Sequence, residues 1–433
     1  MIFESITKSG MNLRNRVVQS ALTRLRADLK TGDPNALMKE YYFQRSEDAG
    51  LIISEALSIS PYSSKNVQAP GIYNEKHVKL WKEIVDMVHS KGTYIFGQLA
   101  HYGRIVHPDL AEGRVALTST TSKVAGQTRV YTGKKDFEEA KGMDESDIKE
   151  VIQDFTNASK NAKLAGFDGV EIHAAHGLLI AQFLNTSINK RTDQYGGSIE
   201  NRCRFLLEIV DAILQNWSPD RVCVKLSFVG RNWGEFNENP IETAEYLLGE
   251  LQKRNIGFVD LLESDPKVKE NNGSLQIDNV AKVGRKYFKN TIITNGFRPI
   301  EERIRKIEEG EADLVSFGEL FVSNPDLVFR LKNKLELTPG RAPLYYEGGE
   351  DGYVDYPFHP SNPRLATEGQ QKAAQVKKEA EMHTEAPKPK VEQKPAEPTP
   401  AELNKPTQMH SGKEEGKDLP HIPANPAKKG GHE

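Results

Sequence analysis

The sequence FDGVEIHAAHGLLIAQFLNTSINKRTDQYGGSIENRCRF, residues 167–205, is the stretch that most clearly indicates the fold. It opens with a short apolar run, Gly169 to Ile172, which predicts a buried parallel strand. The strand breaks at once into a loop that begins His173-Ala174-Ala175-His176. In a barrel of alternating strands and helices, functional groups lie at the carboxyl ends of the strands, because the loops there vary without disturbing the core. The two histidines are therefore candidate functional residues.

Short apolar runs, separated mostly by helix-length segments, recur from the start of the chain to about residue 335. The predicted strands are residues 16–21, 50–55, 93–98, 169–172, 222–227, 257–262, 291–294 and 313–317. Helical spacing supports the connecting segments, since apolar residues recur at threes and fours between Ile148 and Ala165. Eight such strands predict an α/β fold in which a parallel sheet closes on itself, the TIM (β/α)8 barrel.

Two segments depart from this pattern. Residues 103–143, after the third strand, are long and polar and carry a turn at Arg129 to Gly133, which predicts either a hairpin lid or a mere insertion. After about Arg364 no Phe, Trp or Tyr appears, which predicts a disordered tail. We therefore expect a barrel over residues 1–360 and a tail over 361–433, with a short helix between Glu368 and Met382. The tail is either a solvated appendage or a tether that docks on an unknown protein partner.

Composition narrows the class of partner. The 433 residues include 58 Lys and Arg and 61 Asp and Glu, which gives a formal net charge of −3. The chain therefore has no broad basic field that would attract nucleic acid or a membrane surface. No apolar run approaches the ~18 residues of a membrane span, and the amino terminus lacks the pattern of a secretory signal, so we expect a cytoplasmic protein. The two cysteines, Cys203 and Cys223, are expected to be buried thiols rather than a disulfide or metal ligands.

The phrase that follows the histidines, NKRTDQYGGSIENR at residues 189–202, resembles the Old Yellow Enzyme family of FMN-dependent NAD(P)H oxidoreductases. Further landmarks of that family occur in order between Ile2 and Pro357, among them Leu13 to Arg16, His101 to Arg104 and Ser323 to Leu327. The resemblance implies a barrel that binds FMN and takes hydride from NADH or NADPH over the face of the flavin. The absence of a GxGxxG fingerprint agrees with that implication.

The resemblance also implies a set of cofactor contacts. Thr23 would hydrogen-bond the flavin carbonyl near the reactive nitrogen, Gln98 the pyrimidine side of the ring, and Lys225 would lie at the N1 edge. Gly296 and Gly318 would belong to the phosphate-binding segments. From the residues alone, Thr23 can equally be an ordinary strand residue and Gln98 a polar strand end.

By the same resemblance, His173 and His176 would hold the oxygen of a small-molecule acceptor stacked over the flavin. Two imidazole donors can stabilise the negative charge that develops on an enone oxygen when hydride arrives. A metal site is the competing interpretation of His-x-x-His, but no third ligand is evident. A third interpretation is that the histidines merely satisfy backbone groups at the strand end.

Three pocket positions bear on the acceptor. Leu178 replaces the tyrosine that donates a proton in the family, so enone reduction is expected to be impaired, whereas quinone or nitro-type acceptors need that tyrosine less. Ala100 stands in place of a tryptophan and is expected to enlarge the substrate pocket. Tyr346 keeps an aromatic side chain in the pocket wall.

Three further departures concern FMN itself. Lys225 replaces an arginine and keeps its positive charge. Glu319 stands where an arginine reaches the FMN phosphate, and Asn295 replaces a glycine in the phosphate loop. A carboxylate beside a phosphate would repel it, unless it turned outward and left the phosphate to backbone amides.

Three functions remain open. The first is an FMN-dependent NAD(P)H oxidoreductase that reduces a quinone, an enone or a similar acceptor. The second is a catalytically impaired barrel pseudoenzyme with weakened FMN binding, acting as a structural or interaction protein. The third is a flavoprotein that has changed its reaction, for instance to isomerisation.

Overall fold

The computed structural model describes residues 1–228, 233, 237–264, 277–296 and 298–365. All of the described residues belong to one compact unit. The predicted disorder of the tail, its short helix and its docking role all lie outside the described residues. The predicted boundary at residue 360 stays a prediction.

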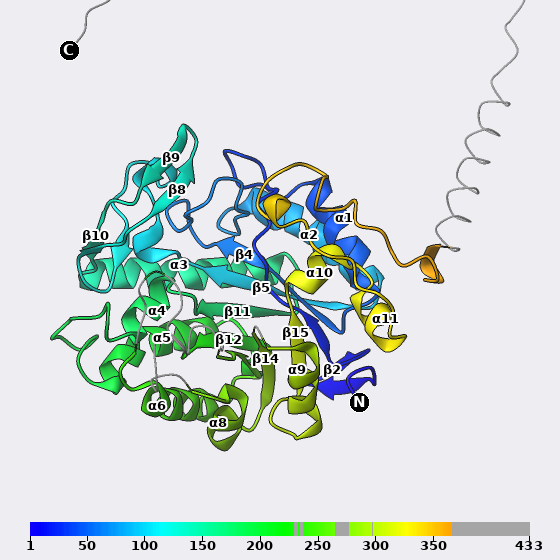
Figure 1. Ribbon diagram of the computed structural model, residues 1–433. Helices are drawn as coiled ribbons and strands as arrows, with labels where there is room; N and C mark the ends of the chain where they lie inside the picture. Colours follow the sequence, from blue (N-terminus) through cyan, green and yellow to red (C-terminus); the bar gives the residue numbers. More distant parts are fainter. Residues whose placement is uncertain (229–232, 234–236, 265–276, 297, 366–433) are drawn as a thin grey trace, which may run out of the picture. The chain divides into compact units, whose positions relative to one another are not determined.

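Eight parallel strands close into a barrel at the centre of this unit (Figure 1). Each strand pairs with the next one along the chain, and β15 pairs with β3 to close the ring. The strands are β3 (Val17–Gln19), β4 (Leu51–Ser58), β5 (Tyr94–Ala100), β11 (Gly169–Ala174), β12 (Val222–Ser227), β13 (Phe258–Leu262), β14 (Thr291–Asn295) and β15 (Leu314–Phe317). All eight predicted strands and the TIM barrel are confirmed.

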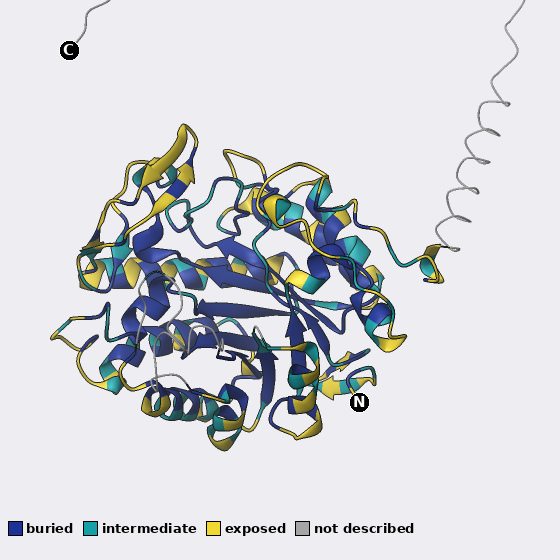
Figure 2. Ribbon diagram, viewed as in Figure 1, coloured by how far each residue is buried: buried dark blue, intermediate teal, exposed yellow. Residues whose placement is uncertain are grey.

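Helices surround the strands (Figure 1), and each of the longer helices has a buried side and an exposed side (Figure 2). The longest, α3, fills the predicted helical segment and begins with a capping box between Asp144 and Asp147, which satisfies backbone amides of its first turn. The longer helices are α1 (Ala36–Ser46), α2 (Glu75–Ser90), α3 (Glu145–Leu164), α5 (Ile199–Leu214), α6 (Pro240–Lys253), α8 (Val280–Tyr287) and α9 (Ile300–Glu308). The short ones are α4 (Leu179–Leu184), α10 (Glu319–Ser323) and α11 (Leu327–Lys332).

A hairpin of β1 (Ile6–Lys8) and β2 (Met11–Leu13) covers the amino-terminal end of the barrel. Its side chains Met11 and Leu13 are buried and join the apolar residues that point into the barrel. Those inward residues are Val18, Leu51, Ile53, Phe96, Cys223, Phe258, Ile293 and Leu314. The bottom of the barrel is therefore a packed apolar layer, and chemistry is left to the opposite end.

The long segment after β5 contains five short strands. β6 (Leu117–Thr118) and β7 (Ser122–Lys123) flank β10 (Glu139–Gly142), and β8 (Gln127–Val130) pairs with β9 (Gly133–Asp136) in an antiparallel hairpin. This hairpin is largely exposed (Figure 2). The predicted hairpin is confirmed, and its role as a lid stays a prediction.

The last described segment packs onto helix α1 and onto the loop that follows β3. Tyr353 is fully buried, and its ring stacks on that of Tyr41 with 4.4 Å between centroids. The Arg24 guanidinium lies 4.9 Å from the centroid of the Tyr353 ring and donates a 2.5 Å hydrogen bond to the carbonyl oxygen of Gly352. Residues from the amino-terminal part and from the last described part of the chain therefore pack together.

Both cysteines are free and buried, Cys203 on α5 and Cys223 on β12, as expected. Among the described residues, no helix has both the length and the apolar character needed to cross a membrane.

Candidate active site

A cavity of about 710 Å³ lies at the carboxyl ends of the barrel strands. Its lining residues come from the ends of β12, β13 and β14, from the loops after β3 and β11, and from α9 and the start of α10. Seven residues named from the sequence line it together: His176, Lys225, Asn295, Gly296, Gly318, Glu319 and Tyr346. Most of the site that the resemblance implies therefore lies in one place, at the carboxyl ends of the strands.

A second cavity, of about 410 Å³, is lined by Thr23, Lys65, Tyr102 and Arg129 among others. Tyr346 lines both cavities. Thr23 thus lies on the second cavity, beside the exposed hairpin that carries Arg129. The two cavities share the Tyr346 side chain as a wall.

Four other expected residues line neither cavity. Gln98 is 2% exposed, and its Nε2 donates a 2.5 Å hydrogen bond to Oε2 of Glu171, inside the barrel. Ala100 and Leu178 are buried in one apolar cluster. The fourth is His173, described next. The flavin contact of Gln98 and the larger pocket at Ala100 stay predictions.

The two histidines face each other at the end of β11. Their ring centroids are 5.5 Å apart, and the rings meet edge to face. The backbone N–H of Ala175 donates to Nδ1 of His173 at 3.3 Å, so the neutral ring carries its proton on Nε2. Burial, with the charges of His176 and Lys225, holds the pKa of His173 well below its usual value. His173 is therefore a neutral hydrogen-bond donor.

The backbone at His176 is unusual, with φ at 57°, in the left-handed region. This conformation is uncommon for a residue with a side chain and marks a fixed turn. Among the described residues, no group of three or more His, Cys, Asp or Glu side chains is arranged to hold a metal ion.

A buried ion pair lies just inside the mouth of the barrel. Lys225 Nζ is 2.5 Å from Asp260 Oδ2, and the two side chains are 3% and 0% exposed. The residues are direct neighbours in the register of β12 and β13. Asn295 Nδ2 donates to Ser20 Oγ at 3.0 Å and contacts Asp260 Oδ2 at 3.4 Å. The amide of Asn295 is thus held against the barrel.

Burial acts on this pair and on a neighbouring acid. Burial alone would lower the pKa of Lys225, but the charges of Asp260 and Glu171 outweigh it and raise the pKa. Burial raises the pKa of Glu171, against the opposing charge of Lys225. Lys225 is therefore held as an ammonium ion whose charge Asp260 offsets. Lys225 was expected at this site from the sequence, whereas Asp260 was not.

Charged residues also surround the outer part of the cavity. Glu319 is exposed to solvent, at the first position of the five-residue helix α10. Arg298 and Arg303 line the same cavity. Neither arginine was picked out from the sequence. Arg298 precedes α9, and Arg303 lies within it, in a segment whose many charged residues are typical of an ordinary amphipathic helix.

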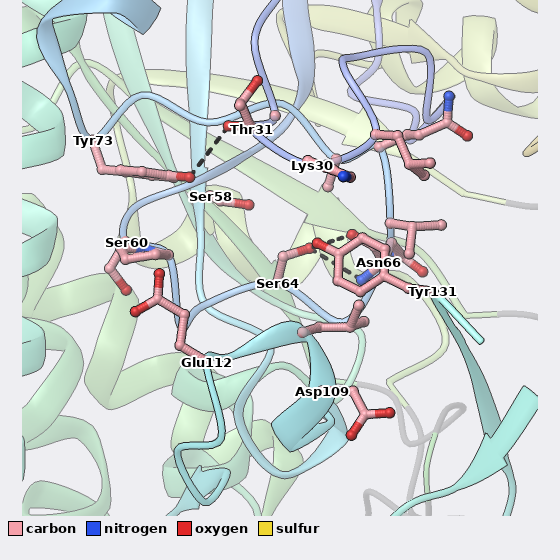
Figure 3. A pocket seen from close by; sticks show the side chains of 17 residues that line it. Lys30, Thr31, Ser58, Ser60, Ser64, Asn66, Tyr73, Asp109, Glu112 and Tyr131 are labelled. Atoms are coloured by element: carbon pink, nitrogen blue, oxygen red, sulfur yellow. Dashed lines mark hydrogen bonds between the residues drawn. The ribbon is translucent and has the colours of Figure 1, made fainter. Parts of the chain in front are cut away.

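A third, smaller cavity of about 180 Å³ lies over the loops that follow β3 and β4 (Figure 3). Polar side chains line it, including Thr31, Ser60 and Asn66. The hydroxyl of Tyr73 donates to the carbonyl oxygen of Thr31 at 3.4 Å across one side. It holds none of the residues named from the sequence.

The chain was compared with known families and curated proteins. The profile of the NADH:flavin oxidoreductase / NADH oxidase family matches residues 1–338. The chain is 37% identical over 350 residues to 12-oxophytodienoate reductase 1 of Oryza sativa subsp. japonica, covering 80% of this chain and 90% of that protein. It is 35% identical over 364 residues to a probable flavin mononucleotide-dependent alkene reductase of Leishmania infantum, covering 83% and 97%.

Solved structures give the same relationship. The structure of morphinone reductase in complex with tetrahydroNAD superposes with a TM-score of 0.78 at 35% identity, covering 83% of this chain and 98% of the other. The Old Yellow Enzyme homologue from Zymomonas mobilis superposes with a TM-score of 0.77 at 34% identity, covering 83% and 99%.

Proposed function

Because the chain belongs to the NADH:flavin oxidoreductase / NADH oxidase family, we propose that it uses FMN to reduce a quinone, an enone or a similar acceptor. The cofactor of the family is FMN and its reductant is NADH or NADPH. The observation that carries the proposal is the cavity in which Lys225, Gly296 and Gly318 meet His176 at the strand ends.

The residues of this cavity fit FMN. At Gly296, φ is +141°, and a Cβ atom would stand 3.1 Å from Cβ of Glu263, so this backbone, which lines the cavity, favours a glycine. Lys225 brings a positive charge to the inner end of the cavity, suited to the edge of a reduced flavin. When bound, FMN supplies the group that accepts hydride from NADH or NADPH and passes it to the acceptor.

The histidine pair is the proposed anchor for the acceptor. The Nε2–H of His173 can donate a hydrogen bond to a carbonyl oxygen of the acceptor, and His176 lines the cavity beside it. Because its lowered pKa keeps His173 neutral, its ring stabilises developing negative charge by hydrogen bonding and does not give up a proton from an imidazolium.

Leu178 sets the expected order of acceptors. Its side chain is 4% exposed, in the apolar cluster that also contains Ala100 and Tyr102, and it has no proton to donate. Reduction of an enone needs a proton at carbon after hydride transfer, whereas a quinone receives its protons on oxygen. We therefore expect quinones to be reduced faster than enones.

The pseudoenzyme alternative rests on Glu319 and Asn295. Glu319 is exposed, so water screens its charge. Asn295 is hydrogen-bonded to Ser20, so its amide is held on the barrel side of the cavity. Both observations reduce the obstacle to FMN and favour the enzyme.

The visible absorbance spectrum of the purified protein tests the proposal. After incubation with excess FMN and desalting, we expect a flavin spectrum, with about one FMN per chain released on denaturation. The bound flavin should be bleached by NADH or NADPH under anaerobic conditions. A folded protein that retains no FMN would refute the oxidoreductase proposal and leave the pseudoenzyme.

The acceptor is tested by Leu178→Tyr, with Leu178→Phe as a control that adds the ring without the hydroxyl. A positioned general acid contributes about 10²–10⁴-fold, so the tyrosine variant should raise kcat for enones by at least about tenfold over the phenylalanine variant. Quinone reduction should differ little between them. Equal enone rates in the two variants would show that a proton donor is not what the site lacks.

A further inference from the structure

We infer that Arg303 of α9 supplies the positive charge for the phosphate of FMN, in place of the arginine whose position Glu319 occupies. This inference rests on the proposed function. Arg303 lies on α9 and Glu319 on α10, and both side chains line the same cavity.

The charges around the cavity single out Arg303. Lys225 is offset by Asp260 at 2.5 Å. Arg298 pairs with Glu302 at 3.5 Å. Among the described residues, no carboxylate lies within ion-pair distance of Arg303, although the residue is only 8% exposed. Among the described Lys and Arg side chains that line the cavity, Arg303 is therefore the one without a carboxylate partner.

The position of Arg303 fits a phosphate at the end of β15. Its Nη1 donates to the carbonyl oxygen of Ser316 at 3.2 Å, and its guanidinium lies 4.4 Å from the centroid of the Phe317 ring. These two residues immediately precede Gly318, which lines the cavity. The guanidinium is therefore fixed beside the segment to which the family resemblance gives the phosphate.

The environment of Arg303 is unfavourable without an anion. Burial lowers its pKa to about 10, which still leaves it charged at neutral pH. Its Nε is buried and has no hydrogen-bond partner. A buried charge without a counter-ion is costly, and a phosphate can offset that cost through charge-assisted hydrogen bonds to a guanidinium.

Glu319 does not compete for this cation. Its side chain is exposed, and no ion pair joins it to Arg303 among the described residues. The cation thus comes from α9, while Glu319 on α10 lines the cavity with its carboxylate exposed to water. The site would then still discriminate FMN from riboflavin, which has the same ring without the phosphate.

The test compares the affinities of FMN and riboflavin for the apoprotein, by quenching of flavin fluorescence. The wild type should bind FMN at least about 100-fold more tightly than riboflavin. Hydrogen bonds to charged groups contribute about 1.5–3 kcal/mol, so Arg303→Gln should weaken FMN binding by about 10–100-fold and leave riboflavin binding within about twofold. Arg305→Gln is the matched control, because Arg305 is an exposed arginine on the same helix that does not line the cavity.

A second variant tests the same point at an exposed position, where folding is not at risk. If Arg303 already offsets the phosphate charge, Glu319→Arg should tighten FMN binding by no more than about tenfold, and it should restore most of the FMN affinity that Arg303→Gln loses. A gain of 100-fold or more in the otherwise unchanged protein would show that the site lacked a cation and would overturn the inference.

The outcomes separate the inference from the proposed function. If the wild type binds neither FMN nor riboflavin, the proposed function fails. If it binds FMN tightly and Arg303→Gln weakens FMN and riboflavin equally, or weakens neither, the inference fails and the proposed function stands. A selective loss of FMN affinity supports both.

Discussion

Two groups of charged side chains serve the same cavity, and the protein holds them in different ways. Lys225 and Asp260 point into the barrel from neighbouring strands, almost fully buried, and the sheet register fixes their contact. Arg303 and Glu319 lie beyond the strands, on α9 and α10, and range from mostly buried to exposed. A change in the inner group, Lys225 and Asp260, needs a matching change in the partner residue. A change at the rim, where Arg303 and Glu319 lie, can be compensated by a residue on another helix.

Removing the inner cation should have the largest effect. Lys225→Met would leave Asp260 buried without its counter-ion, and its charge would still interact with the buried carboxyl group of Glu171. Breaking a buried pair typically costs about 3–5 kcal/mol, and we expect a loss of that size in the free energy of unfolding, measured with urea. The double variant Lys225→Met, Asp260→Met should recover much of it. A loss below about 1 kcal/mol in the single variant would contradict the tight coupling of the inner group.

The stability of the protein should also fall in acid because of His101, a buried residue that directly follows β5. Burial lowers the pKa of His101 to about 3 from 6.5, so between these values the unfolded chain binds a proton that the folded chain does not. Acid therefore favours unfolding in this window, by at most about 1.4 kcal/mol per pH unit for this residue. His101→Gln should make the fall in stability with decreasing pH less steep.

His89 is the matched control for that measurement. It is partly exposed, and its hydrogen bond to Asp168 raises its pKa, so it contributes stability at low pH that is lost as pH rises. His89→Gln should therefore steepen the loss in acid. Parallel curves of stability against pH for the wild type and His101→Gln would refute the assignment of His101 as a buried neutral histidine.

The smallest effect is expected at the outer hairpin. Arg129 Nη1 lies 3.5 Å from Glu347 Oε2, with the side chains 57% and 61% exposed. Exposed pairs contribute about 0.2–1 kcal/mol. A double-mutant cycle with Arg129→Ala and Glu347→Ala should give a coupling energy in that range, again from urea unfolding. A coupling above about 2 kcal/mol would mean that this part of the rim is held as firmly as the interior.

The sequence allowed the barrel to be predicted because its strands are short apolar runs in regular alternation with helices. Val222 to Ser227 was located to the residue, and the other strands to within a few residues. The hairpin at the bottom of the barrel was missed because its strands, each of three residues, give too little periodicity to recognise. The tertiary contact of Met11 and Leu13 with the barrel interior determines it.

The site was only partly predictable for a related reason. The strand-end rule singled out His176, and the family resemblance singled out Lys225 and Gly318; the structure places all three on one cavity. The pairing of Lys225 with Asp260, by contrast, depends on the register between two strands. Charged residues at alternate, inward positions of two successive strands were the available signal. Arg303 gave no such signal, because a cation on an amphipathic helix is usually solvated, and only the tertiary structure shows it to be buried.

The stack of Tyr41 on Tyr353 has a consequence for synthesis of the protein. Helix α1, which carries Tyr41, leaves the ribosome long before Tyr353, the residue on which Tyr41 stacks. Translation of the intervening roughly 300 residues at about 5–20 residues per second takes roughly 15 to 60 s. Throughout that time Tyr41 lacks the Tyr353 ring and Arg24 lacks the carbonyl oxygen of Gly352. The packing around α1 is therefore completed only after nearly all of the barrel has been synthesised.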